Sequence, residues 1–236
     1  MTKDGKEVLL VPMCHLGTEA HYAKVKNYLD SLKSNGYVVF FETVFDCPFH
    51  IDTTNDVNFP QLAEIVKSTV YTKADSMRMD TLNRKFRRIT GFHLGRDGYK
   101  EQDNETLDKK WRTSKYVQQD IRTCGLTTER DIWVDYTQAD LTEVYEKQYG
   151  PTPLTDYDFE TDLKAEYRPD EFLDVNPYAF MSRLRELYLT KRILTSSHDR
   201  IAVVYGEGHT RRLKIDLRFH HGYELDKKYK VPKHQR

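Results

Sequence analysis

Two histidines follow apolar segments near opposite ends of the 236-residue chain. His15 comes shortly after the apolar residues 8–11, and His209 comes shortly after the apolar residues 201–205. Runs without polar residues are typical of parallel strands buried on both faces. Because open α/β sheets bind ligands at the carboxyl ends of their strands, we expect the two imidazoles to meet there. The alternative is two loop histidines that make only local hydrogen bonds.

A carboxylate follows a third apolar segment, because residues 37–41 run directly into Glu42. The apolar residues of 22–32 recur at helical spacing, and Thr18 is suited to cap that helix at its amino end. Strand, helix and strand make a βαβ unit, which predicts that Glu42 lies next to His15. The alternative is a strand-end carboxylate that is simply hydrated.

Three side chains could therefore share one divalent ion, with His15, Glu42 and His209 as ligands and an open position for a water nucleophile. Nitrogen and oxygen ligands of this kind suit zinc, manganese or cobalt. His50 is a further potential ligand of undefined direction. In a metal-free version, Glu42 orients one histidine, which then deprotonates water.

Gly206 and Gly208 separate the last apolar segment from His209. Glycine tolerates positive φ, so we expect a sharp turn here that leaves His209 facing the carboxyl edge of the sheet. The alternating polar and apolar residues of 211–217 then predict an edge strand.

The remaining segments predict further elements of an α/β protein with a mostly parallel central sheet flanked by helices. Amphipathic or capped patterns indicate helices, and a short apolar segment indicates a third parallel strand. The helices are expected at 61–71, 111–124, 139–148 and from Pro177 onward, and the strand at 131–135.

We interpret the chain as a single domain over 1–236 with a basic helical or irregular insertion at 46–110 over the carboxyl edge of the sheet. Residues 151–177 are acidic and aromatic, and they predict an ordered lid-like segment that faces the basic one. The densest basic cluster is 84–88, where Phe86 lies among charges; a solvated face or an anion clamp is favoured over a nucleic-acid surface.

The composition narrows the class of protein. The formal net charge is zero, which disfavours general binding to nucleic acid or membranes. No apolar run approaches the length of a membrane span, and no signal-peptide core follows the basic start. The three cysteines form no CxxC pair and are odd in number, so a reducing compartment is expected and Cys14 is interpreted as structural. A cytoplasmic protein is the prediction, of unknown oligomeric state.

The order of these motifs resembles the TraB/PrgY and TIKI superfamily, to which the erythromycin esterase-like proteins are distantly similar. The family pattern has a strand ending in Gly-x-x-His, a carboxylate after the next strand, an arginine on a late helix and a second Gly-x-x-His strand. Residues 206–209 match the second copy, whereas residues 12–15 lack the glycine of the first. The late-helix arginine would be Arg185, or alternatively Arg183. Tyr136 stands where the family usually has arginine.

The resemblance covers roughly residues 7–45 and 110–220. It implies a hydrolase-like α/β core, because TIKI proteins are regarded as metal-dependent proteases and the esterase-like branch as His/Glu-dependent hydrolases. Cleavage of a peptide or ester bond is the expected activity, with Arg185 stabilising the oxyanion. The alternative is a non-catalytic protein that captures a peptide or small ligand in the same pocket, which the missing first glycine favours.

Overall fold

The computed structural model describes residues 1–68, 72–90, 116–163, 165, 167 and 177–226. The strands are β1 (Thr2–Lys3), β2 (Lys6–Met13), β3 (Leu16–Gly17), β4 (Val38–Phe41), β5 (Val57–Asn58), β6 (Val117–Gln118), β7 (Asp131–Trp133) and β8 (Arg200–Gly206). The helices are α1 (Glu19–Ser34), α2 (Phe59–Ser68), α3 (Lys73–Thr90), α5 (Gln138–Tyr149), α6 (Asp156–Glu160), α7 (Pro177–Thr195) and α8 (Glu207–Phe219).

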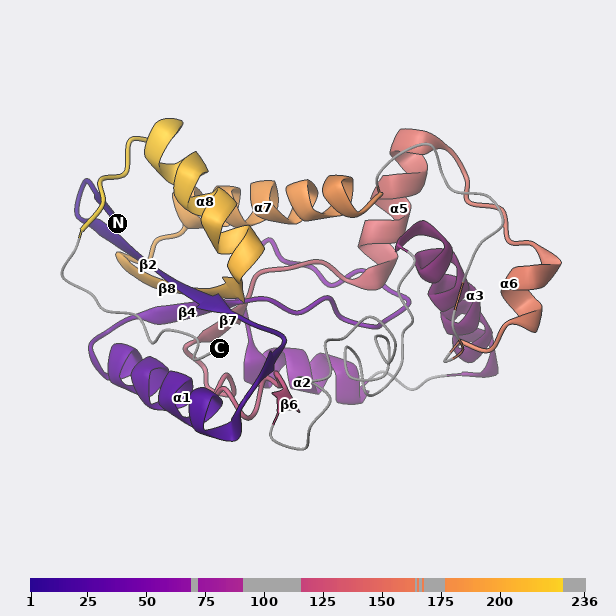
Figure 1. Ribbon diagram of the computed structural model, residues 1–236, viewed down its shortest axis with the longest axis horizontal. Helices are drawn as coiled ribbons and strands as arrows, with labels where there is room; N and C mark the ends of the chain where they lie inside the picture. The colour runs from indigo at the N-terminus through magenta and orange to yellow at the C-terminus, as the bar shows by residue number, and fades with distance from the viewer. Residues whose placement is uncertain (69–71, 91–115, 164, 166, 168–176, 227–236) are drawn as a thin grey trace.

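Six strands form the central sheet in the order β1-β2-β8-β4-β7-β5. The four inner strands run parallel, and the short strands β1 and β5 pair antiparallel at the two edges. Helices α7 and α8 lie over one face of the sheet, and α1 and α2 lie over the other (Figure 1). The predicted α/β fold with a mostly parallel sheet is confirmed.

The core divides into two layers because successive side chains of a strand point to opposite faces. Along β8, Ala202 and Val204 pack with α1 and α2, whereas Ile201, Val203 and Tyr205 pack with α7 and α8. All five side chains are buried, as the unbroken apolar run predicts. Burial on both faces fixes β8 as a central strand.

The first helix forms as its sequence predicts. The Thr18 hydroxyl accepts a hydrogen bond from the backbone N–H of His21 at 3.1 Å, which satisfies one of the free amides of the first turn. Tyr22, Val25 and Leu29 are buried against the sheet. The helix ends at Asn35, and Gly36 adopts a positive φ that leads the chain back into β4.

The predicted adjacency of the first two parallel strands is wrong. Strand β8 lies between β2 and β4 and pairs with both. The two strands of the predicted βαβ unit, β2 and β4, are therefore not neighbours in the sheet. Glu42 and His15 therefore flank the end of β8 from its two sides. Strand order depends on contacts between distant segments, which a local pattern does not encode.

The region after β8 also differs from the prediction. Gly206 caps α8 with φ −50°, and neither Gly206 nor Gly208 has a positive φ, so the strand runs directly into a helix. The expected edge strand at 211–217 is helical; Leu213 and Leu217 are four residues apart and both are buried. Residues four apart lie on the same face of a strand and also on the same face of a helix. The spacing of these two leucines therefore did not distinguish a strand from a helix.

Three of the remaining helices were predicted close to their observed bounds: α2, α5 and α7. The helix expected at 111–124 is wrong in its described part, where residues 117–118 form β6 and residues 121–125 form turns. Gly125 has a positive φ that ends this turn. Residues 91–110 of the predicted basic insertion lie outside the described residues.

Helices α3, α5 and α6 gather at one end of the molecule (Figure 1). The basic cluster of α3 contacts the acidic segment at 155–162, as the opposite charges predicted. Arg87 is fully buried and donates to the carbonyl oxygens of Asp158, Thr161 and Asp162 at 3.0, 3.2 and 2.7 Å. Its guanidinium also lies 4.3 Å from the ring centroid of Tyr167. The cluster thus binds a segment of its own chain.

Candidate active site

The parallel strands deliver four chemically active segments to one edge of the sheet. Met13 at the end of β2 lies opposite Gly206 at the end of β8, and His15 follows two residues later. The backbone N–H of Glu42 donates to the Val204 carbonyl at 3.1 Å, which extends the pairing of β4 by one residue. Asp135 follows β7 at the same edge, two residues beyond the partner of Phe41. The topology therefore brings these residues together.

Three of the predicted residues surround Gly206. A Cβ atom placed on Gly206 would lie 3.4 Å from Glu42 Oε2, 3.8 Å from His209 Cδ2 and 4.0 Å from His15 Nε2. The missing side chain thus leaves a small space bordered by one carboxylate and two imidazoles. The sequence correctly predicted that His15, Glu42 and His209 meet.

Arg185 of α7 is the cation of the site. Its Nε and Nη2 donate to Asp135 Oδ1 and Oδ2 at 2.8 and 2.7 Å, a bidentate arrangement, and Nη2 also donates to Glu42 Oε1 at 2.7 Å. Asp135 is fully buried. Bidentate contacts of this kind are stronger and more directional than single ion pairs. Arg185 consequently fixes the positions of two carboxylates at once.

Glu42 is held as an anion. Burial acts to raise the pKa of its carboxyl, but Arg185, His209 and the backbone N–H of Gly206 outweigh that effect and lower the pKa from its usual value of 4.5. The Gly206 N–H donates to Glu42 Oε2 at 2.5 Å from the amino end of α8, where the helix dipole also favours a negative charge. Burial acts to lower the pKa of Arg185, but Asp135 and Glu42 hold it well above its usual value.

Burial also shifts the pKa values of the Asp135 carboxyl and the His15 imidazole. Complete burial raises the pKa of the Asp135 carboxyl, although Arg185 offsets part of that effect. His15 is exposed at the rim, yet the surrounding protein lowers the pKa of its imidazole by desolvation; Glu42 acts against this shift, while Arg185 and His209 add to it. At neutral pH His15 is therefore a neutral imidazole.

His209 lies deeper and contacts charges on two sides of its ring. Nε2 is 3.4 Å from Arg185 Nη1 and 3.6 Å from Glu42 Oε1, and Nδ1 is 3.0 Å from Glu186 Oε1. The first turn of α8 places the ring there, and only a small part of it reaches the surface.

The predicted metal site does not fit this arrangement. Among the residues that the structure describes, no group of three or more His, Cys, Asp or Glu side chains is placed to hold a metal ion. The physical reason is that the guanidinium of Arg185, a permanent cation, already contacts the Glu42 oxygen and the His209 nitrogen that would be ligands. His15, Glu42 and His209 thus gather around a protein cation instead.

Two other predicted candidates lie away from the chemistry. His50 is largely exposed and its Nδ1 lies 2.8 Å from Asp140 Oδ1. Arg183, the alternative to Arg185, is half exposed and lies 3.8 Å from Glu186 Oε2 and from Asp216 Oδ1. Tyr136, which stands where the family usually has arginine, packs its ring against Tyr188 with the ring centroids 4.9 Å apart.

The sequence did not identify two residues of the site. Asp135 had a signal, because it follows a short apolar strand as Glu42 does. Glu186 had none, since it stands among the charged residues of a long helix and its burial to 1% exposure is decided by packing.

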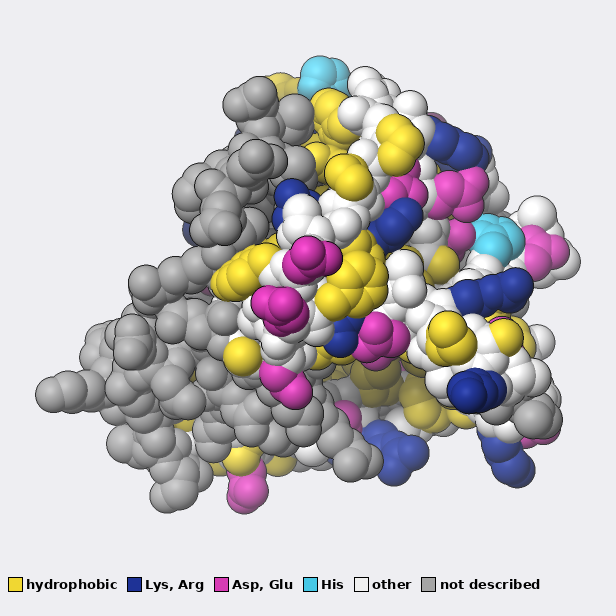
Figure 2. All heavy atoms as spheres, turned by 90° about the vertical axis from the view of Figure 1, so that its right-hand side faces the viewer, with side chains coloured by type: hydrophobic (Ala, Val, Ile, Leu, Met, Phe, Trp, Pro, Cys, Tyr) yellow, Lys and Arg dark blue, Asp and Glu magenta, His cyan; other side chains and the backbone are white. Residues whose placement is uncertain are grey.

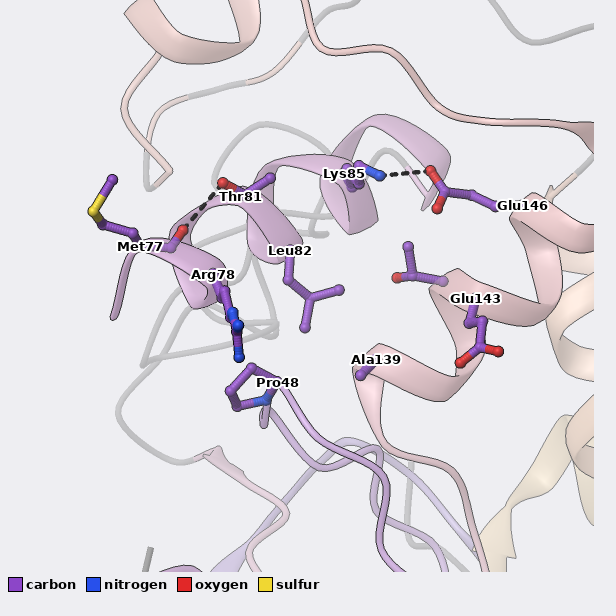
Figure 3. Close-up of a pocket in the computed structure, with 10 residues that line it drawn as sticks. Pro48, Met77, Arg78, Thr81, Leu82, Lys85, Ala139, Glu143 and Glu146 are labelled. Atoms are coloured by element: carbon purple, nitrogen blue, oxygen red, sulfur yellow. Dashed lines mark hydrogen bonds and ion pairs between the residues drawn. The ribbon is translucent and has the colours of Figure 1, made fainter. Parts of the chain in front are cut away.

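A separate hollow of about 440 Å³ lies between α3 and α5. Leu82 of α3 and Ala139 of α5 line it, with Pro48 on the segment that follows β4 (Figure 3). The ion pair of Lys85 and Glu146, at 2.8 Å, bridges the two helices at one end. This end of the molecule carries exposed hydrophobic side chains among charged ones (Figure 2). The hollow has the size of a small-ligand pocket.

The fold and site together define an α/β protein whose parallel strands present a His/Glu/Arg cluster at their carboxyl edge. Comparisons with protein-family models, curated proteins and solved structures found no match. No helix in the described ranges is long and apolar enough to cross a membrane.

Proposed function

We propose that the protein is a hydrolase that activates water for attack on an ester or peptide bond, without a metal ion. The observation that carries the proposal is the convergence of Glu42, His15 and His209 around Gly206. Two imidazoles beside an ionised carboxylate are the groups that general acid–base hydrolysis requires. The resemblance to the erythromycin esterase-like branch points to the same chemistry.

In this proposal His209 is the general base. Its Nε2 takes the proton of the attacking water, and the resulting imidazolium is stabilised by the nearby charge of Glu42, 3.6 Å away. Glu42 itself is a weak base because its pKa is lowered. His15 stands at the exposed rim, where a bound substrate would contact its neutral imidazole.

The proposed role of Arg185 changes from the one the resemblance implied. Three of its N–H groups already bind Asp135 and Glu42, so the guanidinium is directed at carboxylates rather than at a substrate oxyanion. Arg185 is therefore a positioning residue that holds Glu42 in its ionised form.

A second candidate function is capture of a peptide or small ligand without turnover. The hollow between α3 and α5 favours it, because its largely apolar lining and its volume of about 440 Å³ suit a ligand side chain or a small molecule. This function predicts that Leu82→Arg abolishes ligand binding and that Glu42→Gln leaves the affinity unchanged.

The test is hydrolysis of a panel of p-nitrophenyl esters and fluorogenic peptides by the full chain. We expect Glu42→Gln to reduce kcat/KM by about 10²-fold or more, because the imidazolium loses its counter-charge. Activity should survive a chelator. Gly206→Ala should reduce turnover by filling the space between the three groups, whereas Gly208→Ala is the matched control, since no atom lies within 4 Å of its added methyl.

The outcomes separate the two functions. Hydrolysis that is lost in Glu42→Gln and retained in Gly208→Ala supports the hydrolase. Binding of panel compounds without turnover, unchanged in Glu42→Gln, supports the binding protein instead. Turnover that a chelator abolishes would contradict the metal-free mechanism.

A further inference from the structure

Glu186 is a buried carboxylate that contacts the imidazole of His209. It follows Arg185 directly on α7, so the two side chains leave the helix about 100° apart. They reach different nitrogens of one ring: Arg185 Nη1 lies 3.4 Å from Nε2, and Glu186 Oε1 lies 3.0 Å from Nδ1. The imidazole is thus held between a cation and an anion.

The hydrogen-bonding capacities of these groups define the tautomer of His209. A guanidinium has only donors, so Nε2 must accept from Arg185. An ionised carboxylate has only acceptors, so Nδ1 must carry the proton that it shares with Glu186. The neutral ring is therefore the Nδ1–H tautomer, and its Nε2 lone pair accepts from Arg185 with Glu42 Oε1 beside it.

The surroundings of Glu186 indicate a carboxylate placed for this contact. Its second oxygen, Oε2, is buried and accepts no hydrogen bond from the described residues. Arg212 Nη1 reaches Oε1 at 3.3 Å and Arg183 reaches Oε2 only at 3.8 Å, both from more exposed positions. A buried carboxylate with incomplete hydrogen bonding lowers the stability of the fold, so good packing alone does not explain why a glutamate stands at position 186.

We propose that Glu186 is a positioning residue for His209: it holds the proton on Nδ1 and leaves Nε2 as the nitrogen that accepts a proton. The tautomer follows from the contacts alone, whereas its part in turnover rests on the proposed hydrolase function. When Nε2 takes the proton of water, the imidazolium donates Nδ1–H to Glu186 and turns Nε2–H toward Glu42, so each N–H faces an anion. The hydroxide formed is the nucleophile, and no further reactant is needed.

The tautomer can be measured directly by long-range ¹H–¹⁵N correlation spectra of the ¹⁵N-histidine-labelled full chain, with His209→Gln to assign the signals. We expect the Nδ1–H pattern for His209 in the wild type. In Glu186→Gln the carboxamide can donate to Nδ1 as well as accept from it, so only Arg185 still favours a proton on Nδ1, and the share of the Nδ1–H tautomer should fall. Glu207→Gln, which removes an exposed carboxylate from the same turn of α8, should keep the wild-type pattern.

Kinetics of the same variants form the second measurement. A misplaced proton should lower kcat of Glu186→Gln by about 10²- to 10⁴-fold with KM nearly unchanged. Glu186→Asp, which keeps a carboxylate, should recover part of the loss, and Glu207→Gln should match the wild type.

The result that overturns the proposal is an Nε2–H pattern in the wild type, or an unchanged Nδ1–H pattern in Glu186→Gln. Glu186→Ala, which removes the acceptor without supplying a donor, should lower the share of the Nδ1–H tautomer in the same way, so poor folding of Glu186→Gln does not leave the proposal untested. A correct tautomer in a protein that hydrolyses nothing would contradict the hydrolase function and leave the positioning contact standing.

Discussion

At the residue scale, the charge of each group in the site is set by its neighbours. Burial of the Glu42 carboxyl would by itself raise its pKa and favour the neutral form. The pKa is lowered instead, because Arg185 and the Gly206 N–H bind its two oxygens. The sequence indicated that a carboxylate ends an apolar strand. It did not indicate which cation would compensate it, since Arg185 is 143 residues away.

This lowered pKa predicts a pH dependence of stability. A carboxyl whose folded pKa lies below its unfolded pKa stabilises the fold fully above the unfolded value, here about 4.5, and loses that contribution as the pH falls through the folded value. We therefore expect the difference in free energy of unfolding between the wild type and Glu42→Gln to be constant above about pH 4.5 and to shrink below it. Denaturant titrations from pH 7 to pH 3 measure this difference.

The control for that series is Glu207→Gln, whose exposed carboxylate pairs with Arg211 on the surface. Its effect on stability should be small and nearly flat with pH. A difference for Glu42→Gln that grows as the pH falls would have the wrong sign and would contradict an ionised Glu42.

At the element scale, the contact between α3 and the segment of α6 replaces the free basic surface that a cluster of arginines suggests. Arg84 and Arg87 bind backbone carbonyls of residues 158–162, and Arg88 pairs with Asp158 Oδ2 at 3.0 Å. Arginine is suited to this because its several donors can serve several carbonyls at once. Residues 158–162 of the predicted acidic segment are therefore held against α3 by main-chain contacts as well as by charge, whereas residues 168–176 of that segment lie outside the described ranges.

We predict that Arg87→Met lowers the free energy of unfolding by about 1–3 kcal/mol, because the Asp162 carbonyl loses its donor and the Asp158 and Thr161 carbonyls keep only Arg84. Arg78→Met is the matched control on the same helix, since Arg78 is exposed and its ion pair with Asp75 is 3.8 Å long; its effect should stay below about 1 kcal/mol. Denaturant unfolding measures both. Equal effects of the two substitutions would show that the α3–α6 contact contributes little.

At the scale of the whole molecule, the two edges of the parallel sheet hold different kinds of buried charge. The carboxyl edge carries the cluster around Arg185. The amino edge carries Lys33, whose Nζ lies 3.2 Å from Asp131 Oδ2 and donates to the Gly125 carbonyl at 2.8 Å. Lys33 and Asp131 join α1 to the start of β7, whereas Gly206 ends β8 at the opposite edge of the sheet, so we assign them to stability alone.

Lys33→Met should lower the free energy of unfolding by about 3–5 kcal/mol, because it leaves the charge of the fully buried Asp131 without its cation. Below the unfolding transition, the catalytic constants should equal those of the wild type. Lys26→Met, which removes the exposed pair with Asp30, is the control and should cost less than about 1 kcal/mol. A loss of activity in folded Lys33→Met would link the two edges of the sheet.

The sequence by itself determined the local elements and the members of the site that end a strand. Apolar runs located β2, β4 and β8, a capping threonine and helical spacing located α1, and the polar residues after those runs identified His15, Glu42 and His209. These signals succeed because burial of a strand and capping of a helix depend on residues close together in the chain.

Only the tertiary structure decided the strand order, the helix after Gly206 and the partners of the charged groups. Strand β8 inserts between β2 and β4, and Arg185 and Glu186 reach the site from a helix on one face of the sheet. Such contacts join residues far apart in the chain, and their energies depend on which polar groups are buried together. The cation that replaced the predicted metal, and the tautomer of His209, both follow from that packing.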